Sequence, residues 1–240
     1  MTFRRIDKHT TAIVLAGGAG SRMNLDKTKQ KIEILGKSVL RRAVEPFEAC
    51  SFIDEIIVVC RRGELQFAKS EMQGITKLSR IVIGGKTRAE SAINGFSAIK
   101  DKSNGYVLIH DSARCLVSCR DIESVANAAY EHGCATASCL VYDTVKTVDN
   151  NGTIISTVPR ETLRTVQTPQ AFSCELYSRA VNRENIDFDS ITDDNMLMEN
   201  ICATVYAVET DRSNIKITNP ADIEYAEYIL QKREKDSKIT

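Results

Sequence analysis

AIVLAGGAGSRMNLDKTKQ, residues 12–30, is the stretch that decides the fold of this chain. It starts with an apolar run, Ala12–Ala16, which is typical of a strand buried on both faces of a sheet. Gly17–Gly20 follows, and at glycines the backbone amides can approach a ligand closely because no side chain intervenes. Arg22 and Lys29 then add positive charge. A buried strand, a glycine turn and cations in this order predict a phosphate-binding loop.

Simpler interpretations exist for each part of this stretch. The glycines alone favour a tight turn after a core strand, and Lys29 alone fits a solvated surface lysine. The glycines combined with Arg22 and Lys29 favour the phosphate site. The spacing is neither the G-x-G-x-x-G dinucleotide fingerprint nor a Walker loop, which ends in G-K-[ST].

The composition is that of an ordinary globular domain. Apolar residues make up 42% and charged residues 27% of the 240 positions, which suits one α/β domain spanning residues 1–240. Lys plus Arg and Asp plus Glu number 32 each. We therefore expect no nucleic-acid partner and attribute any phosphate specificity to locally placed cations. No apolar run approaches the roughly 20 residues of a membrane span, so no membrane partner is expected.

The N-terminal sequence and the cysteines both favour a cytoplasmic location. The start, MTFRRIDKHT, lacks the apolar segment of a secretory signal. Eight cysteines would allow a disulfide framework or a metal site, but no C-x-x-C pair occurs. We therefore expect buried, reduced thiols.

Apolar runs and helical patterns alternate up to residue 141. The expected strands are 12–16, 55–60, 80–83, 106–110 and 134–141, and the expected helices are 38–50, 63–73, 84–99 and 121–131. This alternation predicts a three-layer, Rossmann-like α/β fold with a mostly parallel sheet. Ligands bind such sheets at the carboxyl ends of the strands, and residues 17–20, 84–88 and 111–114 fall at three such ends. We expect one shared active site there.

The pattern changes after residue 142. Asp143–Val148 and Thr153–Val158 are β-branched runs around Asp149–Gly152, and Asn-Gly is a strong hairpin signal. An isolated pair of strands is marginally stable in water. We expect residues 142–170 to project as a β-arm that buries one face against a second subunit, which would make the protein a homodimer.

The last part of the chain returns to α/β character. We expect a helix over 174–182, a Thr192 N-cap before a short acidic helix, a strand over 202–208 and a terminal helix from Pro220. Lys216 lies between Ile215 and Ile217, so its side chain either snorkels to solvent or points into the site.

His110–Arg114 is a second polar segment at a strand end. A carboxylate such as Asp111 is costly there unless it binds something. A Mg²⁺ ion bridging nucleotide phosphates is one candidate, and a cap for the next segment is the alternative. Arg114 is suited to hold a phosphate as a fork donor, and His110 is expected to make a core contact rather than to act as a base.

Two further groups of residues carry weaker signals. The backbone of Gly84–Arg88, together with Ser91, suits the edge of a pyrimidine base and its ribose. Thr144, Arg160 and Thr168, taken alone, fit a solvated ribbon as well as a binding role.

The sequence L-A-G-G-x-G-S-R-M, with K-Q six residues after the Met, resembles the signature of the sugar-phosphate nucleotidyltransferases. Within that superfamily the chain looks most like the 2-C-methyl-D-erythritol 4-phosphate cytidylyltransferases of non-mevalonate isoprenoid biosynthesis. The resemblance covers nearly the whole chain, in family order, through residues 84–91, 111–114, 143–146, 160, 167–170, 192–194 and 214–218. It implies the same fold, CTP and methylerythritol phosphate as substrates, Mg²⁺ as cofactor and a homodimer.

The resemblance also implies roles for individual residues. The residues implied in catalysis are Arg22, Lys29, Arg160 and Lys216. Arg22 and Lys29 would stabilise the pentacoordinate phosphorus, Lys216 would contact phosphate near the reacting centre, and Arg160 would bind the methylerythritol phosphate. The residues implied in CTP binding are Ala16, Gly17, Gly18, Gly20, Gly85, Arg88, Ser91, Asp111 and Ser112, with Asp111 also next to the metal. The residues implied in acceptor binding are Asp111, Arg114, Thr144, Arg160, Thr168, Thr192 and Lys216, with Thr144 and Arg160 reaching across the dimer.

Three departures from the family pattern leave the acceptor open. Thr28-Lys29-Gln30 replaces Pro-Lys-Gln, Ala16-Gly17-Gly18 replaces Ala-Ala-Gly, and residues 111–115 read DSARC in place of DAARP. Because Gly-Gly also occurs in ribitol-5-phosphate cytidylyltransferases, ribitol 5-phosphate is the alternative acceptor. Hexose-1-phosphate uridylyl- or thymidylyltransferases fit less well, because they usually carry longer sugar-binding segments. A non-catalytic nucleotide-binding protein would bind CTP without releasing pyrophosphate.

Overall fold

A seven-stranded sheet forms the centre of the protein, which we describe from a computed structural model over residues 8–18 and 28–237. The strand order is β11-β7-β10-β6-β1-β4-β5. The strands are β1 (Thr10–Ala16), β4 (Glu55–Cys60), β5 (Leu78–Ile83), β6 (Tyr106–Asp111), β7 (Cys134–Leu140), β10 (Arg164–Ser173) and β11 (Tyr206–Glu209). Only β10 runs antiparallel to its neighbours, β6 and β7. The predicted three-layer α/β fold with a mostly parallel sheet is confirmed.

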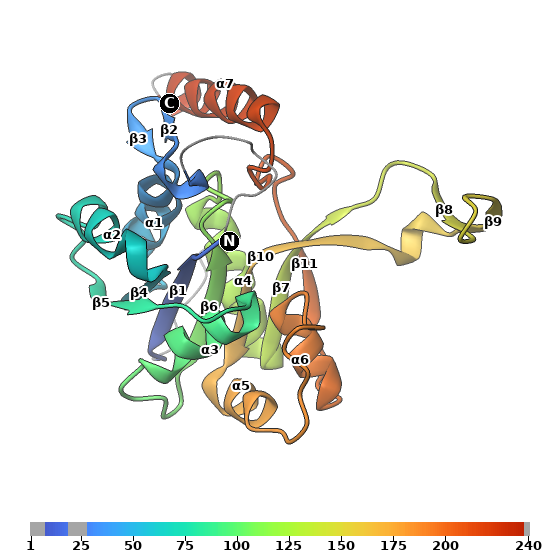
Figure 1. Ribbon diagram of the computed structural model, residues 1–240, viewed down its shortest axis with the longest axis horizontal. Coiled ribbons are helices and arrows are strands. Elements are labelled where there is room, and N and C mark those ends of the chain that lie inside the picture. The colour runs from blue at the N-terminus through green and yellow to red at the C-terminus, as the bar shows by residue number, and fades with distance from the viewer. Residues whose placement is uncertain (1–7, 19–27, 238–240) are drawn as a thin grey trace.

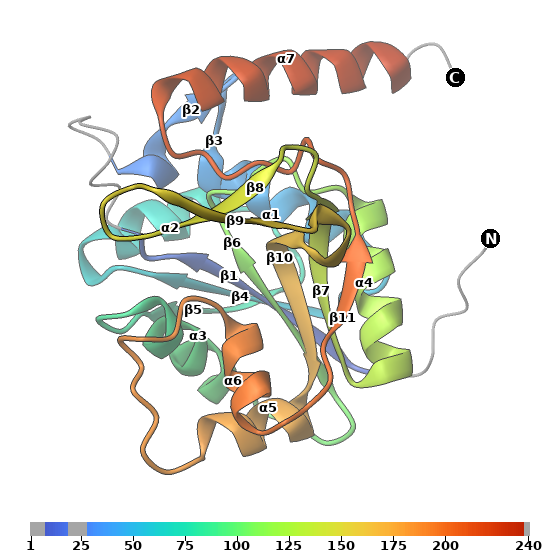
Figure 2. The ribbon, with the colours of Figure 1, turned by 90° about the vertical axis from the view of Figure 1, so that its right-hand side faces the viewer.

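Helices cover both faces of this sheet (Figures 1 and 2). The α-helices are α1 (Val39–Ala49), α2 (Leu65–Glu71), α3 (Arg88–Ser97), α4 (Cys119–His132), α5 (Cys174–Val181), α6 (Asp194–Asn200) and α7 (Pro220–Ser237). The described residues also form three short 3-10 helices, which are η1 (Lys29–Lys31), η2 (Arg62–Glu64) and η3 (Arg160–Thr162). A separate two-stranded sheet consists of β2 (Glu33–Ile34) and β3 (Lys37–Ser38). None of the described helices combines the length and apolarity needed to cross a membrane.

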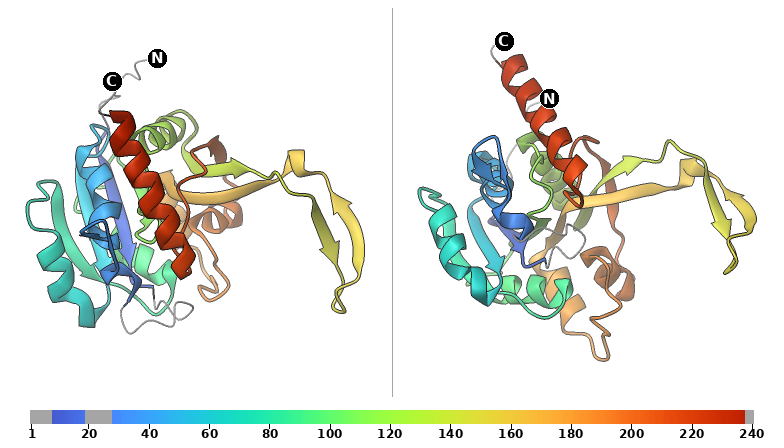
Figure 3. Two further views of the ribbon diagram at one scale, coloured as in Figure 1. Left: turned by 90° about the horizontal axis from the view of Figure 1, so that it is seen from above. Right: turned by 45° about the horizontal axis from the view of Figure 1, so that its top comes forward.

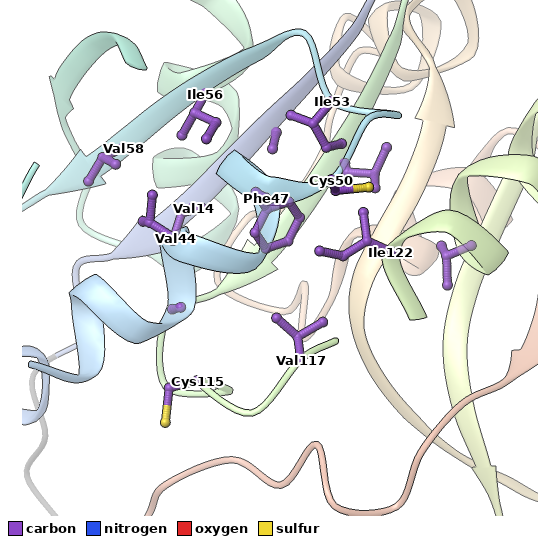
Figure 4. Close-up of a cluster of buried hydrophobic side chains, with 14 of the residues drawn as sticks. Val14, Val44, Phe47, Cys50, Ile53, Ile56, Val58, Cys115, Val117 and Ile122 are labelled. Carbon is purple, nitrogen blue, oxygen red and sulfur yellow. The ribbon is translucent and has the colours of Figure 1, made fainter. Parts of the chain in front are cut away.

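Strand β1 is buried on both faces, as its sequence predicts. Val14 packs into the cluster that contains Phe47 of α1 and Ile56 of β4 (Figure 4). Ile13 belongs to the opposite cluster, with Phe96 of α3. Because successive side chains point to opposite faces of a strand, β1 links the two cores and fixes the position of the glycine turn that follows it.

Helix α6 begins one residue later than predicted. Its N-cap is Asp193, whose side chain accepts a hydrogen bond from the backbone N–H of Met196. Thr192 donates its hydroxyl to the Met196 sulfur at 3.1 Å instead. The Thr192 cap was therefore a wrong prediction. Asp193 takes the N-cap position in place of Thr192. Its carboxylate also accepts hydrogen bonds from the side chains of Gln170 and Asn195, and a carboxylate has more acceptor sites than a threonine hydroxyl.

The Asn-Gly signal produces the predicted hairpin, β8 (Val145–Val148) with β9 (Ile154–Val158). Asp149 accepts hydrogen bonds from the backbone of Asn151 and Thr153, and Gly152 has φ +84°, a value that favours glycine. The hairpin forms a sheet separate from the central one and extends away from it (Figures 1 and 3). All eight cysteines are free, and six of them are buried.

Candidate active site

A cavity of about 350 Å³ lies at the carboxyl ends of β1, β4, β5 and β6. Nine of the residues predicted for the site line it, namely Gly17, Gly18, Lys29, Gly85, Arg88, Ser91, Asp111, Ser112 and Lys216. The predicted Gly20 and Arg22 lie outside the described residues. Ala16 ends β1 directly beside the cavity, fully buried, but does not line it. The residues predicted at the carboxyl ends of the strands therefore gather around one cavity.

The wall beside α3 is built by the start of that helix. Thr87 caps α3 in a capping box with Glu90. The hydroxyl of Ser91 accepts from the N–H of Gly85 at 3.1 Å and donates to the carbonyl of Thr87 at 2.9 Å. A Cβ at Gly85 would lie 2.3 Å from that of Glu90, so this position requires glycine. The turn is held by these hydrogen bonds, and Gly85, Lys86 and Thr87 line the cavity.

Asp111 forms the charged centre of the site with Arg88 and Lys216. Its two carboxylate oxygens accept from Arg88 Nε at 3.0 Å and from Lys216 Nζ at 2.6 Å. Burial alone would raise the pKa of the Asp111 carboxyl, but the charges and hydrogen bonds of Arg88 and Lys216 hold that pKa well below its ordinary value. Asp111 is therefore an ion-pair partner, and its side chain does not cap the next segment. Lys216 points into the site rather than away from it.

Lys29 approaches the same cavity from η1. Its side chain is buried, and its Nζ donates to the carbonyl of Ile217 at 3.1 Å. The interpretation of Lys29 as a solvated surface lysine is therefore wrong. Lys29, Arg88 and Lys216 together make the cavity attractive to a polyanion such as a nucleoside triphosphate.

A second cavity, of about 260 Å³, shares Arg88, Asp111 and Lys216 with the first. These three side chains form a wall common to both cavities, which we call the shared wall. The second cavity is also lined by Arg114, Val166, Gln167, Thr168, Gln170, Thr192 and Asp193. Two adjoining cavities with a charged wall between them suit a reaction in which two anionic substrates meet.

The hairpin residues are not brought to either cavity within one chain. Arg160 is exposed and donates to the carbonyl of Tyr142 at 2.6 Å, and Thr144 is exposed as well. Neither residue lines the two cavities described above. Figure 3 shows the hairpin extending away from the main body.

The chain matches one family of known proteins over most of its length. Residues 10–232 match the family described as 2-C-methyl-D-erythritol 4-phosphate cytidylyltransferase. The chain belongs to this family. A member from Clostridium perfringens is 37% identical over 222 residues, which cover 92% of this chain and 98% of the relative. A member from Alkaliphilus oremlandii is 38% identical over 227 residues, which cover 93% and 96%.

Solved structures of the family share the fold. The 4-diphosphocytidyl-2C-methyl-D-erythritol synthase from Anaerococcus prevotii matches with a TM-score of 0.79 and 29% identity over 93% of this chain and 99% of its own. The 2-C-methyl-D-erythritol 4-phosphate cytidylyltransferase from Francisella tularensis matches with a TM-score of 0.77 and 26% identity over 92% and 99%.

In this member of the cytidylyltransferase family, His110 is a core residue, as predicted. It is fully buried, with Nε2 3.1 Å from the carbonyl of Arg114 and Nδ1 3.0 Å from the hydroxyl of Thr168. A carbonyl only accepts, so Nε2 carries the proton and Thr168 donates to Nδ1. Thr168 also accepts from the N–H of Asp111 at 3.1 Å. His110 therefore orients Thr168 between the strand end and the second cavity.

We predict a pH-dependent stability that comes from His110. Burial lowers the pKa of His110 to about 4, whereas an unfolded histidine titrates near about 6.5. The depressed pKa stabilises the fold above about pH 6.5, and that contribution is lost as the pH falls toward 4. Urea unfolding should show a decrease of roughly 2 kcal/mol between pH 7 and pH 5, where carboxylates change little. The same decrease in His110→Gln would contradict this assignment.

Arg114 lies at the second cavity, with part of its guanidinium already hydrogen-bonded. Its Nη1 and Nη2 donate to the carbonyls of Asn214 and Val166 at 2.9 and 3.4 Å. Its Nε is buried without a hydrogen-bond partner among the described residues. Arg114 lines the second cavity, so it remains a candidate ligand for an acceptor anion.

Sequence reasoning missed several residues of the first cavity. Arg61 and Gln30 line it, and Arg61 Nε donates to the carbonyl of Gly17 at 2.7 Å. Arg61 directly follows β4. Because ligands bind at the carboxyl ends of parallel strands, the same reasoning that pointed to Asp111 would also have pointed to Arg61.

The donor set of the site fits a metal only together with a nucleotide. Within residues 8–18 and 28–237, no group of three or more His, Cys, Asp or Glu side chains is placed to hold an ion. Asp111 is the one carboxylate among the residues described as lining the first cavity. One or two carboxylates plus substrate phosphates are, however, what Mg²⁺ uses in nucleotide enzymes.

Proposed function

We propose that this chain joins CTP and 2-C-methyl-D-erythritol 4-phosphate to give CDP-methylerythritol and pyrophosphate. The observation that carries the proposal is the shared wall of Arg88, Asp111 and Lys216 between two cavities, in a member of the cytidylyltransferase family. The relatives described above bear the methylerythritol name, which favours that acceptor over ribitol 5-phosphate.

CTP would occupy the first cavity and the acceptor phosphate the second. Gly17, Gly85 and Ser91 present backbone and hydroxyl groups suited to the cytidine, while Lys29 lies where anionic phosphates would gather. Arg114 and Thr168 are placed to hold the acceptor phosphate. The two substrates would then meet at the shared wall, as positioning requires.

The reaction needs no activated side chain. An oxygen of the acceptor phosphate forms a bond to the α-phosphorus of CTP, and the bond from that phosphorus to the leaving pyrophosphate oxygen breaks. Negative charge accumulates on the α-phosphate oxygens, so cations aimed at them lower the barrier. Lys29 and Lys216 are the described cations suited to this task, and Arg22 is the further one that the sequence suggests.

We include Mg²⁺ in the proposal, with Asp111 as the residue that would hold it. When bound, the ion would neutralise phosphate oxygens as a Lewis acid. Asp111 keeps its negative charge through Arg88 and Lys216, as a metal ligand must. A cytoplasmic location is part of the same proposal, since all eight cysteines are free and the cytosol keeps thiols reduced.

Pyrophosphate release tests this function. The purified chain is given CTP and Mg²⁺ with either methylerythritol 4-phosphate or ribitol 5-phosphate. We expect turnover with methylerythritol 4-phosphate. Turnover with ribitol 5-phosphate alone would overturn the acceptor assignment, and CTP binding without release from either mixture would show a non-catalytic protein.

We further propose that the hairpin is an arm that completes the site of a second subunit in a homodimer. Val148, Ile154 and Ile155 on it are 55%, 62% and 67% exposed, which is unusual for large apolar side chains grouped on one ribbon. Covering the hairpin with a second copy would bury them. It would also allow Arg160 and Thr144 to reach the partner's acceptor cavity.

Mixed dimers test this arrangement. Arg160→Ala and Lys29→Met variants are each expected to be nearly inactive. A hybrid dimer would combine the intact body of one subunit with the intact arm of the other, giving one complete site out of two. Verified hybrids should therefore recover measurable turnover. Hybrids as inactive as the parent variants would exclude the cross-subunit role of Arg160.

A further inference from the structure

Arg88 contacts a second carboxylate behind the shared wall. Its Nε faces Asp111 at 3.0 Å, and its Nη1 lies 2.5 Å from Asp194 at the start of α6. Asp194 has no exposed surface and lines neither cavity. One guanidinium thus joins a carboxylate in the site to a carboxylate in the core.

Asp194 is itself held from two other elements. The hydroxyl of Tyr177, on α5, donates to its Oδ1 at 2.7 Å, and its backbone N–H donates to Gln170 Oε1 at 3.0 Å. The pKa of Tyr177 is raised well above its ordinary value by burial and by the Asp194 charge, so its hydroxyl remains a donor. Tyr177 packs edge-on against Phe96 of α3, the helix that carries Arg88.

We propose that Asp194 is a positioning residue for cytidylyl transfer, which acts by holding Arg88 at the shared wall. This inference rests on the proposed function. Asp194 supplies a counter-charge for Arg88, so that Asp111 can keep its second oxygen for Lys216. The first and second cavities then retain a fixed wall between them.

The charges explain why one carboxylate is insufficient. The Arg88 guanidinium is always charged, and its Nε and Nη1 face Asp111 and Asp194 at 3.0 and 2.5 Å, so the two carboxylates share its charge. Without the Asp194 charge, the Arg88 fork would have Asp111 as its remaining counter-ion. Arginine prefers to pair with both oxygens of a carboxylate. Asp111 would then turn toward Arg88, and its 2.6 Å contact with Lys216 would weaken.

Asp194→Asn tests the proposal, because it removes the charge and keeps the size. We expect kcat to fall about tenfold to a hundredfold, the scale of a displacement of roughly 1 Å at a reacting centre, with a smaller change in KM for CTP. Met198→Ala is the matched control, since it loosens the same helix at a buried apolar position. At temperatures where it remains folded, Met198→Ala should keep kcat within about threefold.

An Arg88→Met background separates positioning from folding. If Asp194 acts through Arg88, Asp194→Asn lowers kcat when Arg88 is present. In the Arg88→Met background, the same substitution should lower kcat by less than about twofold. Arg88→Met alone would leave the buried Asp194 carboxylate without its cation, so the double variant should unfold at a higher temperature than Arg88→Met.

Two results would overturn the proposal. One is wild-type kcat in folded Asp194→Asn, and the other is an equal loss of kcat on both backgrounds. Failure of the proposed function is distinguishable, because the wild-type chain itself would then release no pyrophosphate with either acceptor.

Discussion

We expect Lys29→Met to lower kcat by about 10²- to 10³-fold, the usual effect of removing one preorganised donor from a developing negative charge. Lys29 is buried, lines the first cavity and is fixed by the Ile217 carbonyl, so its charge is in place before the reaction. The KM for CTP should change much less, because the charge matters most in the transition state. Steady-state kinetics measures both quantities.

Lys31→Met is the matched control for this prediction. Lys31 carries the same charge two residues along η1, but its Nζ lies over the Phe67 ring and it does not line the cavity. We expect nearly wild-type turnover from Lys31→Met. Equal losses in the two variants would show that the charge of η1 acts at long range rather than through Lys29.

We expect Asp111→Asn to lower kcat by about 10²-fold or more, since a buried ion network that loses its central charge loses its geometry. The variant leaves Arg88 and Lys216 without their common partner at the shared wall. It also removes the carboxylate that we assign to Mg²⁺. Turnover measured over a range of Mg²⁺ concentrations should show a higher ion requirement together with the lower maximum.

Asp101→Asn provides the comparison for Asp111→Asn. Asp101 is a surface carboxylate in the turn before β6, whereas Asp111 ends that strand. We expect no change in turnover from Asp101→Asn. Wild-type kcat in Asp111→Asn would contradict the central role of the shared wall.

The sheet could be predicted because each of its parallel strands is marked by a pattern of neighbouring residues in the sequence. Ala12–Ala16 is apolar throughout and is buried on both faces, and Asp111 ends a buried strand at the edge where parallel strands bind ligands. The hairpin was equally visible, since Asn151 and Gly152 specify a turn through their own backbone preferences.

The sequence could not predict what depends on contacts between distant segments. Arg88 and Asp194 are 106 positions apart, and no local pattern joins them. Strand β10 was missed as a ten-residue strand because its sequence, RTVQTPQAFS, is mostly polar and contains Pro169, so no apolar pattern marks it. Its place between β6 and β7, antiparallel to both, is fixed by the chain returning from the hairpin.

The most direct test of the proposed reaction follows labelled oxygen. Methylerythritol 4-phosphate carries ¹⁸O at its three non-bridging phosphate oxygens and is incubated with the chain, CTP and Mg²⁺. The masses of the products are then measured by mass spectrometry. We predict CDP-methylerythritol that retains all the label, together with unlabelled pyrophosphate. Label in the pyrophosphate, or the absence of a cytidine-containing product, would contradict attack of the acceptor phosphate on the α-phosphorus of CTP.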